Sequence, residues 1–177
     1  IYQIESTGTA LRAGVGKSFR APSYTDLFYN TSWYDGNPGL ESQTSIGWDV
    51  GVDQSLGSHH TLEVTWFSNH IEDAIESYYD PEGDFVYTST NLPGTTVTDG
   101  LELGLRGDWF ENKLGYRVAW TYLHQSLSGQ PRNATTADIH WQPTEKILVG
   151  TGATALSSHS WGGNPIDGYA LFRLYGS

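Results

Sequence analysis

The chain has 177 residues, no cysteine, and 20 acidic against 9 basic side chains, which gives a formal net charge of −11. The absence of cysteine excludes a disulfide framework, a thiolate metal site and a cysteine nucleophile. The acidic excess argues against nucleic acid as a partner, because a nucleic-acid-binding face must be basic to neutralise phosphates. The chain contains no run of about 18 apolar residues, which a transmembrane helix would need.

Segments in which apolar residues alternate with small or polar residues recur along the chain and predict β-strands. In chain order they cover residues 7–19, 44–56, 60 to about 79, a segment around 97–105, 114–122, 133–141, 147–153 and a last one from about 168. No segment predicts a helix. Aromatic residues make up 14 % of the chain, although hydrophobic residues of all kinds make up only 37 %. This balance suits an all-β fold that is apolar on one face, with aromatics near an interface.

The alternation separates an apolar face from a polar face most cleanly between residues 114 and 122. The apolar positions are Leu114, Tyr116, Val118, Trp120 and Tyr122, and the positions between them are Gly115, Arg117, Ala119 and Thr121. Strands of ~10 to 15 residues are long for a soluble sandwich but suit tilted strands that cross a membrane. Short turns at one end and longer loops at the other are typical of outer-membrane barrels, in which Trp109, Phe110 and Trp141 beside short turns would form an aromatic girdle.

A sheet that crosses a bilayer must close, because no water there satisfies unpaired backbone groups. The predicted fold class is therefore an antiparallel transmembrane β-barrel, with residues 1–177 as one section of it. The alternating pattern still continues in the last residues, "ALFRLYGS". We therefore expect the barrel to contain more strands than these residues supply.

The longest predicted loop and its flanks carry a series of short motifs. Residues 14–53 read "GVGKSFRAPSYTDLFYNTSWYDGNPGLESQTSIGWDVGVD". This stretch resembles the late barrel region of TonB-dependent outer-membrane receptors. There, a Gly-x-Gly-x-x-(Phe/Tyr)-(Arg/Lys)-Ala-Pro run leads to an extracellular loop with Leu-(Phe/Tyr), and a Gly-Asn-Pro-x-Leu element follows. The matching residues are Gly14, Gly16, Phe19, Arg20, Ala21, Pro22, Leu27, Phe28, Gly36, Asn37, Pro38, Leu40 and Ser45.

Further motifs extend the resemblance over nearly the whole chain. The segment "NLPGTTVTDGLELGLRG" is similar to the family's Asn followed by Gly-x-Glu, at Asn91, Gly100 and Glu102. Glu41-Ser42-Gln43 stand where the family usually has Pro-Glu, which bears on the subgroup more than on the fold. The nearest subgroup is the vitamin B12 and siderophore receptors. The resemblance implies about eight strands of a roughly 22-stranded barrel, without the plug domain and the last strands.

The resemblance also implies a function. The protein would be a receptor in the outer membrane of a Gram-negative bacterium, for energy-coupled uptake of a bulky, scarce nutrient such as a ferric siderophore, haem or cobalamin. This metal-chelate ligand would bind at extracellular loops. The TonB energy-coupling complex would act through a plug domain that is absent from this chain, and outer-membrane lipid would contact the apolar face.

Two groups of residues are candidates for contact with a ligand. In the aromatic loop, Tyr29, Trp33 and Tyr34 would offer a platform for a bulky ligand, and Asp35 and Asn37 would supply hydrogen bonds. The same aromatic residues also suit a loop that packs onto itself. On the predicted lumen face lie Arg106, Arg117 and Glu102. The resemblance implies that such charges meet the plug or line the substrate path, but an ion pair with an acid such as Glu63 is the simpler expectation.

Catalytic motifs are missing, so we expect that the chain is not an enzyme. It contains no Gly-x-Ser-x-Gly elbow and no His-Glu-x-x-His motif. The hairpin "YYDPEGD" carries Asp80, Glu82 and Asp84, and oxygen-rich loops with a glycine turn can hold Ca²⁺. The resemblance adds that some vitamin B12 receptors bind calcium in extracellular loops. A charged, solvated hairpin is the preferred interpretation, and no resident cofactor is expected.

Two other classes stay open at this point. The first is a passive, porin-like or small structural outer-membrane barrel, which an upstream plug domain in the parent gene would argue against. The second is a soluble β-sandwich that binds a ligand. A chain that is monomeric without detergent would support the sandwich, because the apolar faces of membrane strands need lipid.

Overall fold

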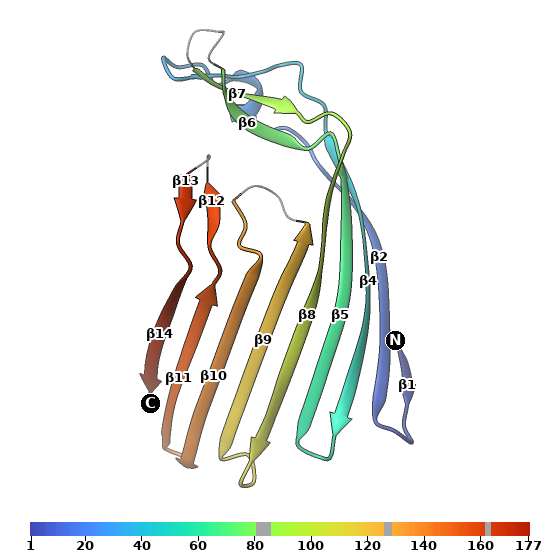
Figure 1. The fold of residues 1–177 in the computed structure, drawn as a ribbon, viewed down its shortest axis with the longest axis vertical. Helices are drawn as coiled ribbons and strands as arrows, with labels where there is room; N and C mark the ends of the chain where they lie inside the picture. Colours follow the sequence, from blue (N-terminus) through green and yellow to red (C-terminus); the bar gives the residue numbers. More distant parts are fainter. Residues whose placement is uncertain (81–85, 126–128, 162–163) are drawn as a thin grey trace. The chain divides into compact units, whose positions relative to one another are not determined.

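A computed structural model describes the chain except for residues 81–85, 126–128 and 162–163 (Figure 1). Strands dominate it. Their bounds are β1 Tyr2–Ile4, β2 Thr9–Arg20, β3 Tyr34–Asp35, β4 Gln43–Leu56, β5 His60–Glu72, β6 Ile75–Asp80, β7 Val86–Asn91, β8 Thr95–Trp109, β9 Leu114–Gln125, β10 Asn133–Thr144, β11 Ile147–Leu156, β12 His159–Trp161, β13 Asn164–Ile166 and β14 Tyr169–Gly176. One short helix, α1, covers Tyr24–Phe28. No helix in the described part of the chain is long and apolar enough to cross a membrane.

Two compact units make up the chain, and each is described by itself. The first, here called the sheet unit, contains residues 1–14, 49–68 and 98–177. The second, here called the loop unit, contains residues 15–48 and 69–97. The long strands β2, β4, β5 and β8 contribute residues to both units.

Nine strands form one sheet in the order β1-β2-β4-β5-β8-β9-β10-β11-β14 (Figure 1). The pairs from β8 to β14 are all antiparallel, and so is β1 with β2. The strands β1 and β14 are the two edges of this order, so the described strands do not close into a barrel. The prediction of an antiparallel sheet of long strands is confirmed.

Short turns join the long strands at one end of the sheet. Gly57, with a φ of 71°, lies in the turn between β4 and β5, where a left-handed backbone favours glycine. The turn between β8 and β9 uses three successive non-glycine residues of positive φ, Phe110, Glu111 and Asn112. The turn between β10 and β11 consists of Glu145 and Lys146, because β10 continues to Thr144 through a register irregularity after Trp141. Pro143 falls in that irregularity, where a missing backbone N–H costs no ladder hydrogen bond.

Three further features differ from the prediction: one strand is divided, a second sheet is present, and there is a short helix. The expected strand from residue 60 to about 79 is two strands, because β5 ends at Glu72 and the chain turns at Asp73, whose φ is 53°. The short strands β3, β7 and β6 form a second sheet of their own, with β3 parallel to β7. The expectation of no helix is wrong for α1, a single turn whose five residues are too short to show helical periodicity.

Apolar side chains of the sheet unit stay exposed. Val118, Ile139 and Val149 on the inner strands are 39 %, 42 % and 53 % exposed. Trp109, Phe110 and Trp141, beside the short turns, are exposed as well. The buried hydrophobic residues among those described are Tyr34, Ile71, Ala74 and Ile75, and all four belong to the loop unit. The sheet unit therefore presents an apolar face, whereas the loop unit has a small core.

Candidate functional site

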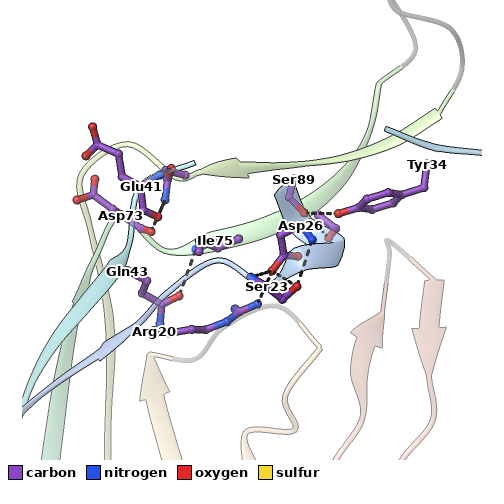
Figure 2. A network of polar contacts seen from close by, with 11 residues as sticks. Arg20, Ser23, Asp26, Tyr34, Glu41, Gln43, Asp73, Ile75 and Ser89 are labelled. Carbon is purple, nitrogen blue, oxygen red and sulfur yellow. Dashed lines mark hydrogen bonds and ion pairs between the residues drawn. The ribbon is translucent and has the colours of Figure 1, made fainter. Parts of the chain in front are cut away.

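The aromatic loop begins with the helix α1, which a capping box starts. The Ser23 hydroxyl accepts a hydrogen bond from the backbone N–H of Asp26 (3.1 Å), and the Asp26 carboxylate accepts one from the N–H of Ser23 (2.8 Å; Figure 2). Each partner satisfies a backbone donor that the helix leaves free. The carboxylate also lies 3.5 Å from the guanidinium of Arg20. Burial alone would raise the pKa of Asp26, but the hydrogen bonds that its carboxylate accepts from the Ser23 hydroxyl (2.7 Å) and from the Ser23 N–H, together with the Arg20 charge, lower this pKa below its usual value.

The chain after α1 folds back onto the helix. The backbone N–H of Asn37 donates to the Asp26 carbonyl (2.8 Å), and the N–H of Gly36 donates to the Asn30 side chain (2.9 Å). A Cβ at Gly36 would lie 2.7 Å from the Phe28 nitrogen. Only glycine permits so close an approach of two backbone segments. The motif Gly36-Asn37 thus has a local structural role.

Tyr34 lies inside the loop unit rather than on its surface. Its side chain is 8 % exposed, and its hydroxyl lies 2.9 Å from the Ser89 hydroxyl (Figure 2). Ser89 is 1 % exposed and lies 3.0 Å from the hydroxyl of Ser77. This chain of hydroxyls satisfies polar groups that burial removes from water. Tyr34, which the sequence suggested for ligand contact, packs the strand β3 against β7.

Two asparagines fasten the loop to the hairpin of β6 and β7. The Asn37 amide donates to the Ser89 carbonyl (3.0 Å). Asn91 accepts from the N–H of Glu41 (2.8 Å) and donates to the carbonyls of Glu41 (3.0 Å) and Asp73 (2.8 Å). The bonds between Asn91 and Glu41 join segments that lie 50 residues apart in the sequence. The segment 30–43 is therefore held in a defined conformation.

The hairpin contributes aromatic side chains that the sequence did not suggest for the site. Tyr79 and Tyr87 are exposed, with ring centroids 5.4 Å apart. The Tyr87 N–H donates to the Trp33 carbonyl (2.9 Å), which brings β7 beside the loop. Trp33 and Tyr29 are exposed too, with centroids 6.4 Å apart. We call these four side chains, two ring pairs on neighbouring segments of the loop unit, the aromatic surface. Tyr79, within the predicted hairpin "YYDPEGD", and Tyr87, just after it, were the signal in the sequence.

The two polar residues suggested for the site, Asp35 and Asn37, differ in their exposure to solvent. Asp35 is exposed next to the aromatic surface, on the strand β3. Asn37 is half-buried, and its amide is already bonded within the loop unit. The structure therefore brings Tyr29, Trp33 and Asp35 to the surface, and leaves Tyr34 and Asn37 as the residues that position them.

On the polar face of the sheet unit, long side chains lie across glycines of the neighbouring strand. Arg12 passes Gly51 to reach Thr65 (3.2 Å), and it also pairs with Asp53 (2.7 Å). Glu63 similarly lies over Gly104. At the edge of the sheet, Arg173 and Tyr175 lie over Gly152 and Gly150 and bond to Asp138 at 3.0 Å and 2.8 Å. Each glycine leaves the space that a Cβ would fill. We call these positions glycine windows.

The three charged residues suggested for the lumen lie on this polar face. Arg106 forms an ion pair with Glu63 (3.1 Å), as expected. Glu102 lines a small hollow together with Arg12 and Glu63. Arg117 differs from the expectation, because it makes no ion pair with any residue that the structure describes. Its neighbour Asp138 is instead bonded to Arg173.

The suggested calcium residues cannot be placed. Glu82 and Asp84 lie outside the described residues, and so does the side chain of Asp80. Within the described parts of the chain, no group of three potential ligand side chains is arranged to hold a metal ion. Calcium at this hairpin stays a prediction.

Comparisons with known proteins identify the fold. A family described as "TonB dependent receptor-like, beta-barrel" matches residues 1–177. The vitamin B12 transporter BtuB of Vibrio vulnificus (strain YJ016) is 30 % identical over 92 residues, which are 51 % of this chain and 14 % of BtuB. This chain therefore corresponds to a small part of that relative.

Solved structures of other proteins share the fold of this chain. The copper transporter OprC superposes with a TM-score of 0.77 at 15 % identity, over 99 % of this chain and 29 % of OprC. A mutant of the Pseudomonas aeruginosa ferric enterobactin receptor PfeA, in complex with enterobactin, gives 0.72 at 22 % identity, over 95 % of this chain and 30 % of PfeA. These likenesses show the fold, and the family comprises transport receptors rather than enzymes. From its first residue to its last, this chain belongs to the β-barrel family of the TonB-dependent receptors.

Proposed function

We propose that the chain is part of an outer-membrane receptor for the energy-coupled uptake of a bulky, scarce nutrient. The family match supports this proposal, and so do the two faces of the sheet unit. The exposed apolar face would contact outer-membrane lipid. The polar face, with its ion pairs and glycine windows, would line the lumen.

The observation that carries the proposal is the aromatic surface on a rigid loop unit. Tyr29, Trp33, Tyr79 and Tyr87 are exposed, although the segments that bear them are fixed by buried hydrogen bonds. Large aromatic side chains held in place offer a wide contact area at low entropic cost. Asp35 beside them would supply a polar contact. A large ligand with flat or apolar parts fits this surface better than a small ion.

Ferric siderophores, haem and cobalamin share that chemistry. Of the three relatives named above, two are described as a vitamin B12 transporter and a ferric enterobactin receptor, which supports a metal chelate as the ligand class, and the third is described as a copper transporter. Uptake would depend on the TonB complex, acting on a plug domain supplied by other parts of the parent protein. No calcium ion is part of this proposal.

Binding and uptake by the full-length parent protein test the proposal. Cobalamin, haem and a ferric siderophore would be titrated separately. We expect saturable binding of one of them, weakened about 10-fold or more by Trp33→Ala, because exposed tryptophans often dominate interfaces. Tyr24→Ala is the matched control, since Tyr24 is an exposed aromatic outside the aromatic surface.

Uptake in cells separates a receptor from a passive barrel. The receptor loses uptake when the host lacks TonB, whereas a passive barrel keeps it. Binding of none of the three chelates, together with TonB-independent uptake, contradicts the proposal.

A further inference from the structure

The small sheet of β3, β7 and β6 in the loop unit has two faces of different character. Side chains alternate between the faces along a strand, and paired residues of neighbouring strands share a face. Tyr34 on β3 pairs with Tyr87 on β7, and Ser89 lies two positions further along β7, so all three belong to one face. Tyr34 and Ser89 are buried there. The residues that alternate with them point away from this packing.

A row of three residues crosses the opposite face. Thr88 on β7 is the register partner of Asp35 on β3 and also of Tyr78 on β6. Asp35 is exposed, Tyr78 is 45 % exposed and Thr88 is half-buried. Because two strand spacings separate them, Asp35 and Tyr78 stand roughly 10 Å apart with Thr88 between them. A small group bound above Thr88 would therefore lie between a carboxylate and an aromatic ring.

The carboxylates on this face have no cationic partner among the described residues. Glu76 lies two positions before Tyr78 on β6 and so shares its face. Neither Glu76 nor Asp35 forms an ion pair in the part of the chain that the structure describes. Residues 69–97, which include β6 and β7, contain no lysine or arginine. The counter-charge for this face must therefore come from the solvent or from a ligand.

The acidic excess of the chain is concentrated in the same unit. The loop unit contains nine acidic residues and only two basic ones, Lys17 and Arg20. The guanidinium of Arg20 already lies 3.5 Å from Asp26. A surface dominated by one sign of charge attracts ligands of the opposite sign and repels those of the same sign. The charge of the loop unit therefore favours a positively charged ligand.

From this geometry we propose that the row of Asp35, Thr88 and Tyr78 binds a positively charged group of the transported chelate, an inference that rests on the proposed function. The carboxylate supplies the opposite charge, the Thr88 hydroxyl accepts a hydrogen bond, and the face of the Tyr78 ring attracts a cation. Ammonium and guanidinium groups have this chemistry. The receptor thus selects chelates that carry a positive group and disfavours anionic ones.

Pairs of ligands that differ in charge test the selection. A ferric linear trihydroxamate with a free ammonium group is compared with its N-acetylated form, aquacobalamin with cyanocobalamin, and haem dimethyl ester with haem. Each would be titrated into the full-length parent protein in detergent, at low salt and at about 0.5 M NaCl, which screens exposed charges. For the chelate class that binds, we expect the more positive member to bind about 10-fold more tightly at low salt, and this preference to shrink at high salt.

Two substitutions assign the preference to the proposed row. Asp35→Asn removes the carboxylate, and Tyr78→Leu removes the ring but keeps an apolar side chain. Each should lower the affinity for the more positive ligand about 3-fold and should not lower that for the less positive one. The retained affinity also shows that the variant is folded. Asp167→Asn, which removes an exposed carboxylate of the sheet unit, is the matched control and should keep the full preference.

Equal affinities within a pair, or tighter binding of the more negative member, overturn the inference. A preference that is the same in Asp35→Asn and in Asp167→Asn overturns it as well. Trp33→Ala separates these results from a failure of the proposed function. If Trp33→Ala weakens both members of a pair, the receptor stands and only the charge selection is wrong. If no chelate binds and uptake is independent of TonB, the proposed function fails, and this inference fails with it.

Discussion

The loop unit and the sheet unit place their apolar side chains in opposite ways. In the loop unit, Tyr34, Ile71, Ala74 and Ile75 are buried, and so is the hydroxyl-bearing Ser89. In the sheet unit, apolar residues such as Val118 point outward, and the positions between them carry arginines, acids and glycines. The loop unit therefore has a small buried core, whereas the sheet unit keeps its apolar side chains on an exposed face.

The stability of the two units therefore depends on their surroundings to different degrees. A core residue of the loop unit is stabilised by its neighbours, whatever surrounds the protein. An outward residue of the sheet unit has few protein neighbours, so its contribution depends on the medium it meets. Substitutions in the two units should respond differently, and four of them test the comparison.

The largest effect is expected for Tyr34→Ala. Removing a buried aromatic ring typically costs about 3–5 kcal/mol. Hydrogen exchange of the β7 amides in the full-length protein would measure the lowered free energy of opening of the loop unit. Tyr34→Phe keeps the ring and loses only the hydrogen bond to Ser89, so it should cost about 1 kcal/mol. Unchanged exchange in Tyr34→Ala would show that the loop unit has no core of its own.

Val118→Arg should destabilise the sheet unit by about 2–4 kcal/mol in lipid vesicles, because it places a charge against hydrocarbon. Urea unfolding would measure the loss. Thr121→Arg is the control on the polar face, where its cross-strand partner is Glu102. Equal losses for both variants would contradict the assignment of the two faces.

Gly150→Ala should cost about 1–3 kcal/mol, as overpacked positions do. The added methyl would meet the rigid ring of Tyr175 across a glycine window. Gly16→Ala is the matched control, because a Cβ there has no neighbour within 4 Å. Urea unfolding of both variants would measure whether the stability of the sheet unit requires glycine at position 150. Similar unfolding midpoints for the two variants would show that it does not.

The smallest effect concerns Asp26 and pH. Because the folded-state pKa is lower than that of the unfolded chain, the carboxylate contributes stability at pH values above the unfolded pKa. That contribution is lost as pH falls through the lowered folded pKa. Asp26→Asn should remove this pH dependence and cost about 1 kcal/mol at neutral pH. Thermal melting along a pH series, with exposed Asp167→Asn as control, would measure it. Parallel pH profiles for the wild type and the Asp26→Asn variant would contradict the role given to the capping box.

The sheet was predictable because period-two alternation is a local property. The strand at 114–122 has the face pattern that the register of β9 with β8 and β10 shows. The small elements were less predictable. The helix α1 has only five residues, and its clearest signal, serine and aspartate three positions apart at Ser23 and Asp26, is short and common.

The candidate site depended on non-local contacts, which the sequence does not display. Tyr34 has the same aromatic character as Trp33, and only the hydroxyl of Ser89, 55 residues later, separates a packed ring from an exposed one. The ion pair of Arg106 with Glu63 was predictable, because the alternation places both side chains on one face of the sheet. The absence of an ion pair at Arg117 was not predictable, because Asp138, its cross-strand neighbour, is bonded to Arg173, which reaches over Gly152.

The two windows at Gly150 and Gly152 also bear on how β14 finds its place beside β11. In the native register, Tyr175 stands opposite Gly150 and Arg173 opposite Gly152. A slip of two residues in one direction would put Arg173 against the side chain of Thr154. A slip in the other direction would put Tyr175 against Leu148. Each misaligned pairing places one of these long side chains opposite a residue that has a side chain of its own, so the two glycines favour the native register of β14 on β11.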